Sequence, residues 1–211
     1  MTFLTRIGKD AVSGVVVEDA PEAVLAIHRA GCAAAIWRRR PADMFQRWID
    51  GLDPANLPGG RCILHRTQVR TAVIELCEIA GTPPCEGRDH LIEDIAALSE
   101  IFAHVMNAGY LRLRLDAVTT NACRKFHTDR ITARLVCTYR GTGTQYGTSR
   151  NGADPSRIFT TPTGAPILLR GTLWPENPAS GLLHRSPPIE GTGETRLVLV
   201  LDPIFDPEDE T

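Results

Sequence analysis

A histidine and an aspartate stand two residues apart in the segment Phe126-His127-Thr128-Asp129. On an extended chain, residues two apart point to the same face, so the imidazole and the carboxylate would lie side by side. This pair suits a divalent metal ion, because imidazole nitrogen and carboxylate oxygen are common metal ligands. The alternative is a strand end at which the histidine only caps a backbone carbonyl.

A second histidine, His184, ends the apolar segment Gly181-Leu182-Leu183 and would come from a distant strand. Two histidines and one carboxylate on one face of a metal form the facial triad of non-haem Fe(II) sites, which leaves coordination positions open. The same three ligands would also bind Zn²⁺. A structural histidine at the end of a strand is the alternative for His184.

An arginine, Arg196, opens the apolar segment Leu197-Val198-Leu199-Val200-Leu201. If its side chain pointed into the protein, its burial would be costly unless the guanidinium met an anion. At the start of a strand it could instead point to water. Two aromatic residues, Tyr139 and Trp174, are candidates for the wall of a pocket, with ordinary packing as the alternative for both.

The elements that must position these residues change character near residue 109. Before it, apolar residues recur at three- and four-residue steps, which is typical of helices. The pattern predicts one short strand, over 33–37, and helices over 19–31, 41–52, 67–80 and 88–106.

After residue 109 the apolar period becomes two, and Gly, Pro and Thr separate the apolar runs. Many short strands with regular turn signals indicate a sandwich or barrel. The pattern predicts strands over 111–118, 131–139, 157–161, 165–170, 181–186 and 195–202.

Together these patterns predict a single α+β domain over 1–211, because helices precede strands within about 200 residues. A mainly helical buttress (1–108) would pack on a jelly-roll-like β-sandwich (109–203) that carries the metal site. An acidic, proline-broken tail (204–211) would fray.

Composition excludes several classes of protein. The chain has 211 residues, 43% of them hydrophobic, and a net charge of −2, so nothing indicates a nucleic-acid or membrane partner. Charges near the N-terminus replace the apolar core of a signal peptide, so we expect a cytoplasmic location. The six cysteines show no C-x-x-C spacing and are expected to be reduced. Of the 23 basic residues 21 are arginines, so a carboxylate-binding site would use arginine.

The motifs resemble those of the Fe(II)/2-oxoglutarate-dependent dioxygenase superfamily, in which H-x-D precedes a distal histidine and an arginine. His127, Asp129, His184 and Arg196 match in order and approximate spacing. Residues 110–202 carry the resemblance, which implies a double-stranded β-helix. The segments NACRKFHTDRITARLVCTYRGTGTQY and GLLHRSPPIEGTGETRLVLVLD also resemble the bacterial family known as domain of unknown function 1826, which brings no established reaction.

The superfamily resemblance implies a dioxygenase in which His127, Asp129 and His184 hold Fe(II). It also implies that Arg196 pairs with the distal carboxylate of 2-oxoglutarate as co-substrate. The oxidised substrate, a small molecule or a peptide, is left open. Two alternatives remain at this point: a non-catalytic Zn²⁺- or Fe²⁺-binding accessory protein on the same fold, and a β-sandwich interaction domain without metal.

Overall fold

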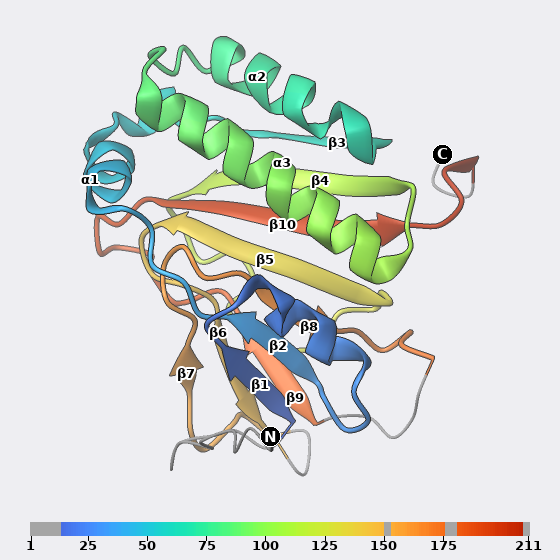
Figure 1. Cartoon of the computed structure of the whole chain (residues 1–211). Helices are drawn as coiled ribbons and strands as arrows, with labels where there is room; N and C mark the ends of the chain where they lie inside the picture. Colours follow the sequence, from blue (N-terminus) through green and yellow to red (C-terminus); the bar gives the residue numbers. More distant parts are fainter. Residues whose placement is uncertain (1–13, 150–152, 176–180, 209–211) are drawn as a thin grey trace, which may run out of the picture.

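A computed structural model describes residues 14–149, 153–175 and 181–208. Its main feature is a seven-stranded sheet with a smaller sheet packed against one face (Figure 1). Across the large sheet the strands are β1 (Val15–Glu18), β2 (Ala34–Trp37), β8 (Ile167–Arg170), β5 (Ala133–Arg140), β10 (Arg196–Ile204), β4 (Tyr110–Val118) and β3 (Gly60–His65). The small sheet has the order β7 (Phe159–Thr160), β6 (Gln145–Thr148) and β9 (Leu182–Arg185).

The long strand β10 lies near the centre of the large sheet and pairs antiparallel with β4 on one side and β5 on the other. Side chains alternate between the two faces of a strand, and β10 separates its residue types accordingly. Leu197, Leu199 and Leu201 are fully buried on the face that the helices cover. Arg196 and Val198 face the small sheet. One face therefore supplies the core, and the other is free to carry polar residues.

The three α-helices lie together over one face of the large sheet, and α3 runs diagonally across β4, β10 and β5 (Figure 1). Apolar residues at helical spacing explain this packing, since Leu91, Leu98 and Phe102 of α3 are at most 1% exposed. The helices are α1 (Asp43–Gly51), α2 (Val69–Ile79) and α3 (Glu86–Met106), with short 3-10 helices η1 (Pro21–His28), η2 (Pro54–Asn56) and η3 (Arg66–Gln68). None of the helices in the described part of the chain has the length and apolarity needed to cross a membrane.

The prediction of a mainly helical N-terminal half is not confirmed, because strands begin at residue 15. The strands β1, β2 and β3 all precede residue 109 and belong to the large sheet. Only β2 was predicted. The other two are edge strands of four and six residues, too short for a clear period of two. Helices and sheet thus share the N-terminal half.

Other boundaries also differ. β6 lies in a segment that the sequence indicated as a glycine-rich turn. β10 runs on to Ile204, which is 3% exposed, so the strand takes in the first residue of the expected tail. Residues 1–13, on which the expected location relied, and 209–211 lie outside the described residues. All six cysteines are free, as expected.

Candidate metal centre

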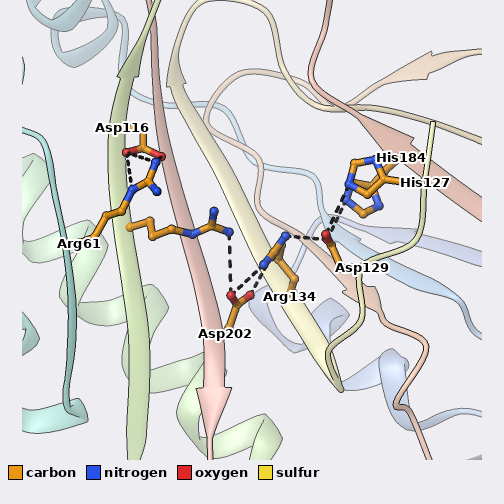
Figure 2. A network of polar contacts seen from close by, with 8 residues as sticks. Arg61, Asp116, His127, Asp129, Arg134, His184 and Asp202 are labelled. Carbon is orange, nitrogen blue, oxygen red and sulfur yellow. Dashed lines mark hydrogen bonds and ion pairs between the residues drawn. The ribbon is translucent and has the colours of Figure 1, made fainter. Parts of the chain in front are cut away.

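Two imidazoles and one carboxylate converge between the two sheets. The ligand atoms of His127, Asp129 and His184 lie within 4.8 Å of one another. The distance from Nε2 of His127 to Oδ1 of Asp129 is 3.4 Å, and that from Nε2 of His184 to Oδ2 of Asp129 is 3.0 Å. The structure therefore brings together the three residues that the sequence indicated as metal ligands (Figure 2).

Backbone pairing explains this convergence. His127 and His184 face each other in an isolated antiparallel bridge, in which each backbone N–H donates to the other carbonyl at 3.1 and 2.9 Å. Directly opposed residues project to the same side, and the two rings lie 4.6 Å apart between centroids. On the other side of β9, His184 is in register with Tyr146 of β6. His184 is thus held from both flanks.

The imidazole of His127 has a defined orientation. Its Nδ1 lies 2.8 Å from the backbone carbonyl of Lys125, so Nδ1 donates a proton there and Nε2 is the nitrogen left toward Asp129. Histidine ligands of metals commonly donate their other ring N–H to a carbonyl in this way. The hydrogen bond therefore presents Nε2 as a ligand.

A chain of charges continues from Asp129 into the large sheet (Figure 2). Nη1 of Arg134 lies 2.7 Å from Oδ2 of Asp129. The same guanidinium donates from Nε and Nη2 to the two carboxylate oxygens of Asp202, at 2.7 and 2.8 Å. Asp202 is 2% exposed, so Arg134 joins the candidate metal ligand to a second buried carboxylate.

These charges keep Asp129 ionised. Burial alone would raise the pKa of its carboxyl group, but the contact with His184 and the electrostatic effects of His184, Arg134 and His127 outweigh burial. The pKa of Asp129 is therefore held well below its usual range. An anionic carboxylate beside two imidazoles is the protonation state that a cation requires.

The residues fit a divalent metal ion. Oδ2 of Asp129 is buried, and although it lies 2.7 Å from Nη1 of Arg134 and 3.0 Å from Nε2 of His184 it forms no well-aligned hydrogen bond in the described structure. A buried acceptor of this kind is usually satisfied, so it is suited to a further partner. Two neutral nitrogens and one carboxylate oxygen match the 2-His-1-carboxylate donor set of Fe(II) oxygenases and also suit Zn²⁺.

Arg196 points into the protein and not to water. It is 2% exposed, and burial lowers its pKa to about 10. Nε donates to the backbone carbonyl of Thr142 at 2.6 Å and Nη2 to the hydroxyl of Thr138 at 3.3 Å. Among the described residues it forms no ion pair. A buried guanidinium without a carboxylate partner is costly, and a bound anion would relieve that cost.

Arg196 and two of the candidate ligands line the same cavity, which has a volume of about 110 Å³. Its apolar walls come from the large sheet and include Val136, Val198 and Val200. Further lining residues are Arg114, Asp116, Val118, Ala122, Cys123, Arg134, Thr144, Arg185 and Ser186, together with His127, His184 and Arg196 themselves.

The two aromatic candidates lie elsewhere. Tyr139 is 1% exposed among the helices, where its hydroxyl donates to Asp94 at 2.7 Å. Trp174 packs against His28 and beneath the guanidinium of Arg170. Neither lines the cavity, contrary to expectation. Tyr139 occupies an odd-numbered position of β5, which faces the helices, and Trp174 anchors a loop.

The sequence analysis missed Arg134 and Asp202. A signal was available, because Arg134 alternates with the apolar residues of its strand, as Arg196 opens another. The argument that an inward arginine needs an anion applies to both. Arg134 pairs with Asp202 because β5 and β10 lie side by side in a register that brings the two residues together. The pattern of a single strand does not contain that register.

A family model described as "Protein of unknown function (DUF1826)" matches residues 18–202. A comparison with curated proteins finds no match.

Among solved structures, the rice dioxygenase for auxin oxidation matches 94% of this chain and 85% of its own, at 12% identity and a TM-score of 0.51. The Arabidopsis thaliana dioxygenase for auxin oxidation 1, in complex with 2-oxoglutarate, matches 81% and 74% at 12% identity, with a TM-score of 0.47. An oxidoreductase of the 2OG-Fe(II) oxygenase family from Burkholderia pseudomallei matches 88% and 91% at 14% identity, with a TM-score of 0.43. At these identities the rice structure shows the fold, so the predicted jelly roll is confirmed.

Proposed function

We propose that this protein is a mononuclear non-haem Fe(II)/2-oxoglutarate-dependent dioxygenase. The chain belongs to the family described as "Protein of unknown function (DUF1826)". One observation carries the proposal. The buried guanidinium of Arg196 lines the same small cavity as the imidazoles of His127 and His184. A metal-binding protein without a co-substrate would need the three ligands but has no need of that arginine.

In this proposal His127, Asp129 and His184 hold Fe(II) through two ring nitrogens and one carboxylate oxygen. Such a donor set would leave coordination positions free for other molecules. When bound, Fe(II) and 2-oxoglutarate supply oxidation by O₂, in which the co-substrate becomes succinate and CO₂ and the substrate gains one oxygen atom.

Arg196 would hold the distal carboxylate of 2-oxoglutarate. Its planar fork can make two parallel hydrogen bonds to a carboxylate, which a lysine could not. The hydrogen bond from Nε to the carbonyl of Thr142 fixes the guanidinium in the cavity before any ligand arrives. Val136, Val198 and Val200 form apolar walls of the cavity, and apolar surroundings strengthen a charge-assisted bond.

The test is an anaerobic titration of Fe(II) into the full chain, with and without 2-oxoglutarate, monitored for a visible charge-transfer band and by calorimetry. Wild type is expected to bind 2-oxoglutarate only when a metal is present. Arg196→Met is expected to bind it about ten- to a hundredfold more weakly, because it loses charge-assisted bonds of about 1.5–3 kcal/mol. Its metal affinity is expected to stay unchanged.

The matched control is Arg70→Met, which removes an exposed arginine paired with Glu93 on the helical side. It is expected to bind both ligands like wild type. If metal-loaded wild type does not bind 2-oxoglutarate, or if Arg196→Met binds it equally well, the co-substrate assignment is wrong. Non-catalytic metal binding is then the better-supported function.

A further inference from the structure

A band of arginines crosses the large sheet beside the candidate metal centre. We define the arginine band as Arg61 of β3, Arg112 and Arg114 of β4, and Arg134 of β5. These residues, with Cys62, Ile63 and Asp202, line an open hollow of about 520 Å³. The hollow adjoins the metal cavity, because Arg114 and Arg134 line both.

Strand register places two of these cations directly opposite each other. Arg61 pairs with Arg114 across β3 and β4, and like charges in that arrangement repel. The neighbouring cross-strand pair of β4 and β10 joins Arg112 to Asp202. The sheet therefore accepts a local excess of positive charge at Arg114.

The nearby carboxylates are already committed to other arginines. Asp116 lies 3.2 Å from Nη2 of Arg61. Asp202 binds Arg134 through both oxygens, which leaves Arg114 a contact of 3.9 Å from its Nη2 to Oδ2. That distance is too long for a hydrogen bond.

Arg114 is consequently under-satisfied for a cation whose side chain is only 24% exposed. Its Nε is buried without a hydrogen-bond partner among the described residues. Burial and then the charge of Arg134 lower its pKa. Both effects act against the charged guanidinium, and an additional anion would reverse them.

The residues around Arg114 indicate what kind of molecule would carry such an anionic group. On β10 the residue in register with Arg114 is Val200, which in turn is in register with Val136 of β5. These valines line the metal cavity together with His127 and His184. A ligand whose charged end met Arg114 would therefore lay an apolar body along the valines toward the metal ligands.

We propose that Arg114 binds the anionic group of the substrate that this protein oxidises. The substrate class is then a small organic acid, in which an apolar body carries a carboxylate, phosphate or sulfate. The inference rests on the proposed function for the oxidation itself, whereas the anion site stands on the geometry of the arginine band. Arg196, 2% exposed and bonded to Thr142 and Thr138, remains for the co-substrate.

The experiment compares probes that share one apolar body: hexanoate, hexyl phosphate and the neutral hexanamide. Calorimetry measures their binding to the full chain loaded with Zn²⁺ in saturating 2-oxoglutarate, at fixed ionic strength. The two anions are expected to bind wild type at least tenfold more tightly than hexanamide. Arg114→Gln is expected to abolish this preference and Arg114→Lys to keep part of it, while 2-oxoglutarate binding changes less than twofold. Arg70→Gln is the matched control and should keep the full preference.

Equal binding of hexanamide and hexanoate to wild type would overturn the inference without any variant. An unchanged preference in Arg114→Gln would overturn it as well. The same probe titrations on Arg196→Met without 2-oxoglutarate, with a separate titration of 2-oxoglutarate into that variant, distinguish this result from the proposed function. Loss of 2-oxoglutarate binding with a retained anion preference would sustain the Arg114 site. Failure of wild type to bind 2-oxoglutarate, with the anion preference intact, would overturn the proposed function alone.

Discussion

The two faces of the large sheet use the same strands for different purposes. Toward the helices, β10 presents Leu197, Leu199 and Leu201, all fully buried among other apolar residues. Toward the small sheet the same strand presents Arg196 at its start and Asp202 near its end, both 2% exposed. One face is thus a conventional core, whereas the other buries charges at comparable depth.

The difference matters because buried charge is expensive and buried leucine is not. On the cavity face the cost is met in part by pairing, as Arg134 does with Asp202 and Asp129. Arg196 and Arg114 lack an equivalent close carboxylate in the described structure. Charges that the protein itself leaves incompletely paired are candidates for ligand binding, and both line the same cavity as the candidate metal ligands His127 and His184.

The largest effect is expected from the metal ligands. His127→Ala, Asp129→Ala and His184→Ala should each reduce metal content to below about a tenth of wild type, because a facial triad has no spare protein ligand. Metal analysis of untagged protein purified without chelators measures this. His65→Ala and His104→Ala are the matched controls. Both histidines lie outside the candidate site, so these variants should retain full metal content. Equal metal content in all five variants would contradict the site.

A smaller effect, on stability alone, should separate the two faces. Leu199→Ala opens a cavity among the helices and should lower the free energy of unfolding of the metal-free protein by about 2–5 kcal/mol. Val200→Ala, on the adjacent position facing the cavity, should lower it by about 1 kcal/mol, because this side chain is only partly buried. Urea denaturation measures both. Similar losses would mean that the two faces do not differ as described.

The features that could be predicted from the sequence are those that a local pattern or a motif reports. The period of two over residues 111–118 gave β4, and the spacing of Leu91, Leu98 and Phe102 gave α3, because local periodicity reports burial directly. His127, Asp129 and His184 were found through motif order. The edge strands β1 and β3 were missed because a short edge strand carries little periodic signal.

The rest could not follow from local pattern. Arg134 binds Asp202 because β5 and β10 are adjacent strands, and the topology of the sheet decides which strands are adjacent. Tyr139 was misplaced for a related reason. An aromatic residue in a strand near a motif can face either the helices or the cavity. The hydrogen bond from Tyr139 to Asp94 on α3 shows that it faces the helices.

The smallest predicted effect concerns Arg134, which touches a candidate metal ligand but lies outside the triad. Arg134→Lys keeps the positive charge, yet one ammonium group cannot reach Asp129 while also spanning both oxygens of Asp202. Asp129 should then be less well oriented, and metal affinity should fall by about tenfold, the lower end of the range for partners that orient ligands. Competition with a chromophoric chelator measures the affinity.

A second measurement separates orientation of the ligand from a general loss of structure. In Co²⁺-loaded protein, a reoriented Asp129 should shift the visible ligand-field bands, whereas mere destabilisation of the fold would leave the bands of the loaded protein in place. Arg70→Lys, at the exposed pair with Glu93, should change neither affinity nor spectrum. If Arg134→Lys matches wild type in both measurements, Arg134 only stabilises the sheet. In that case only the three candidate ligands, and not Arg134, would distinguish the ligand-binding face of the sheet from its core-forming face.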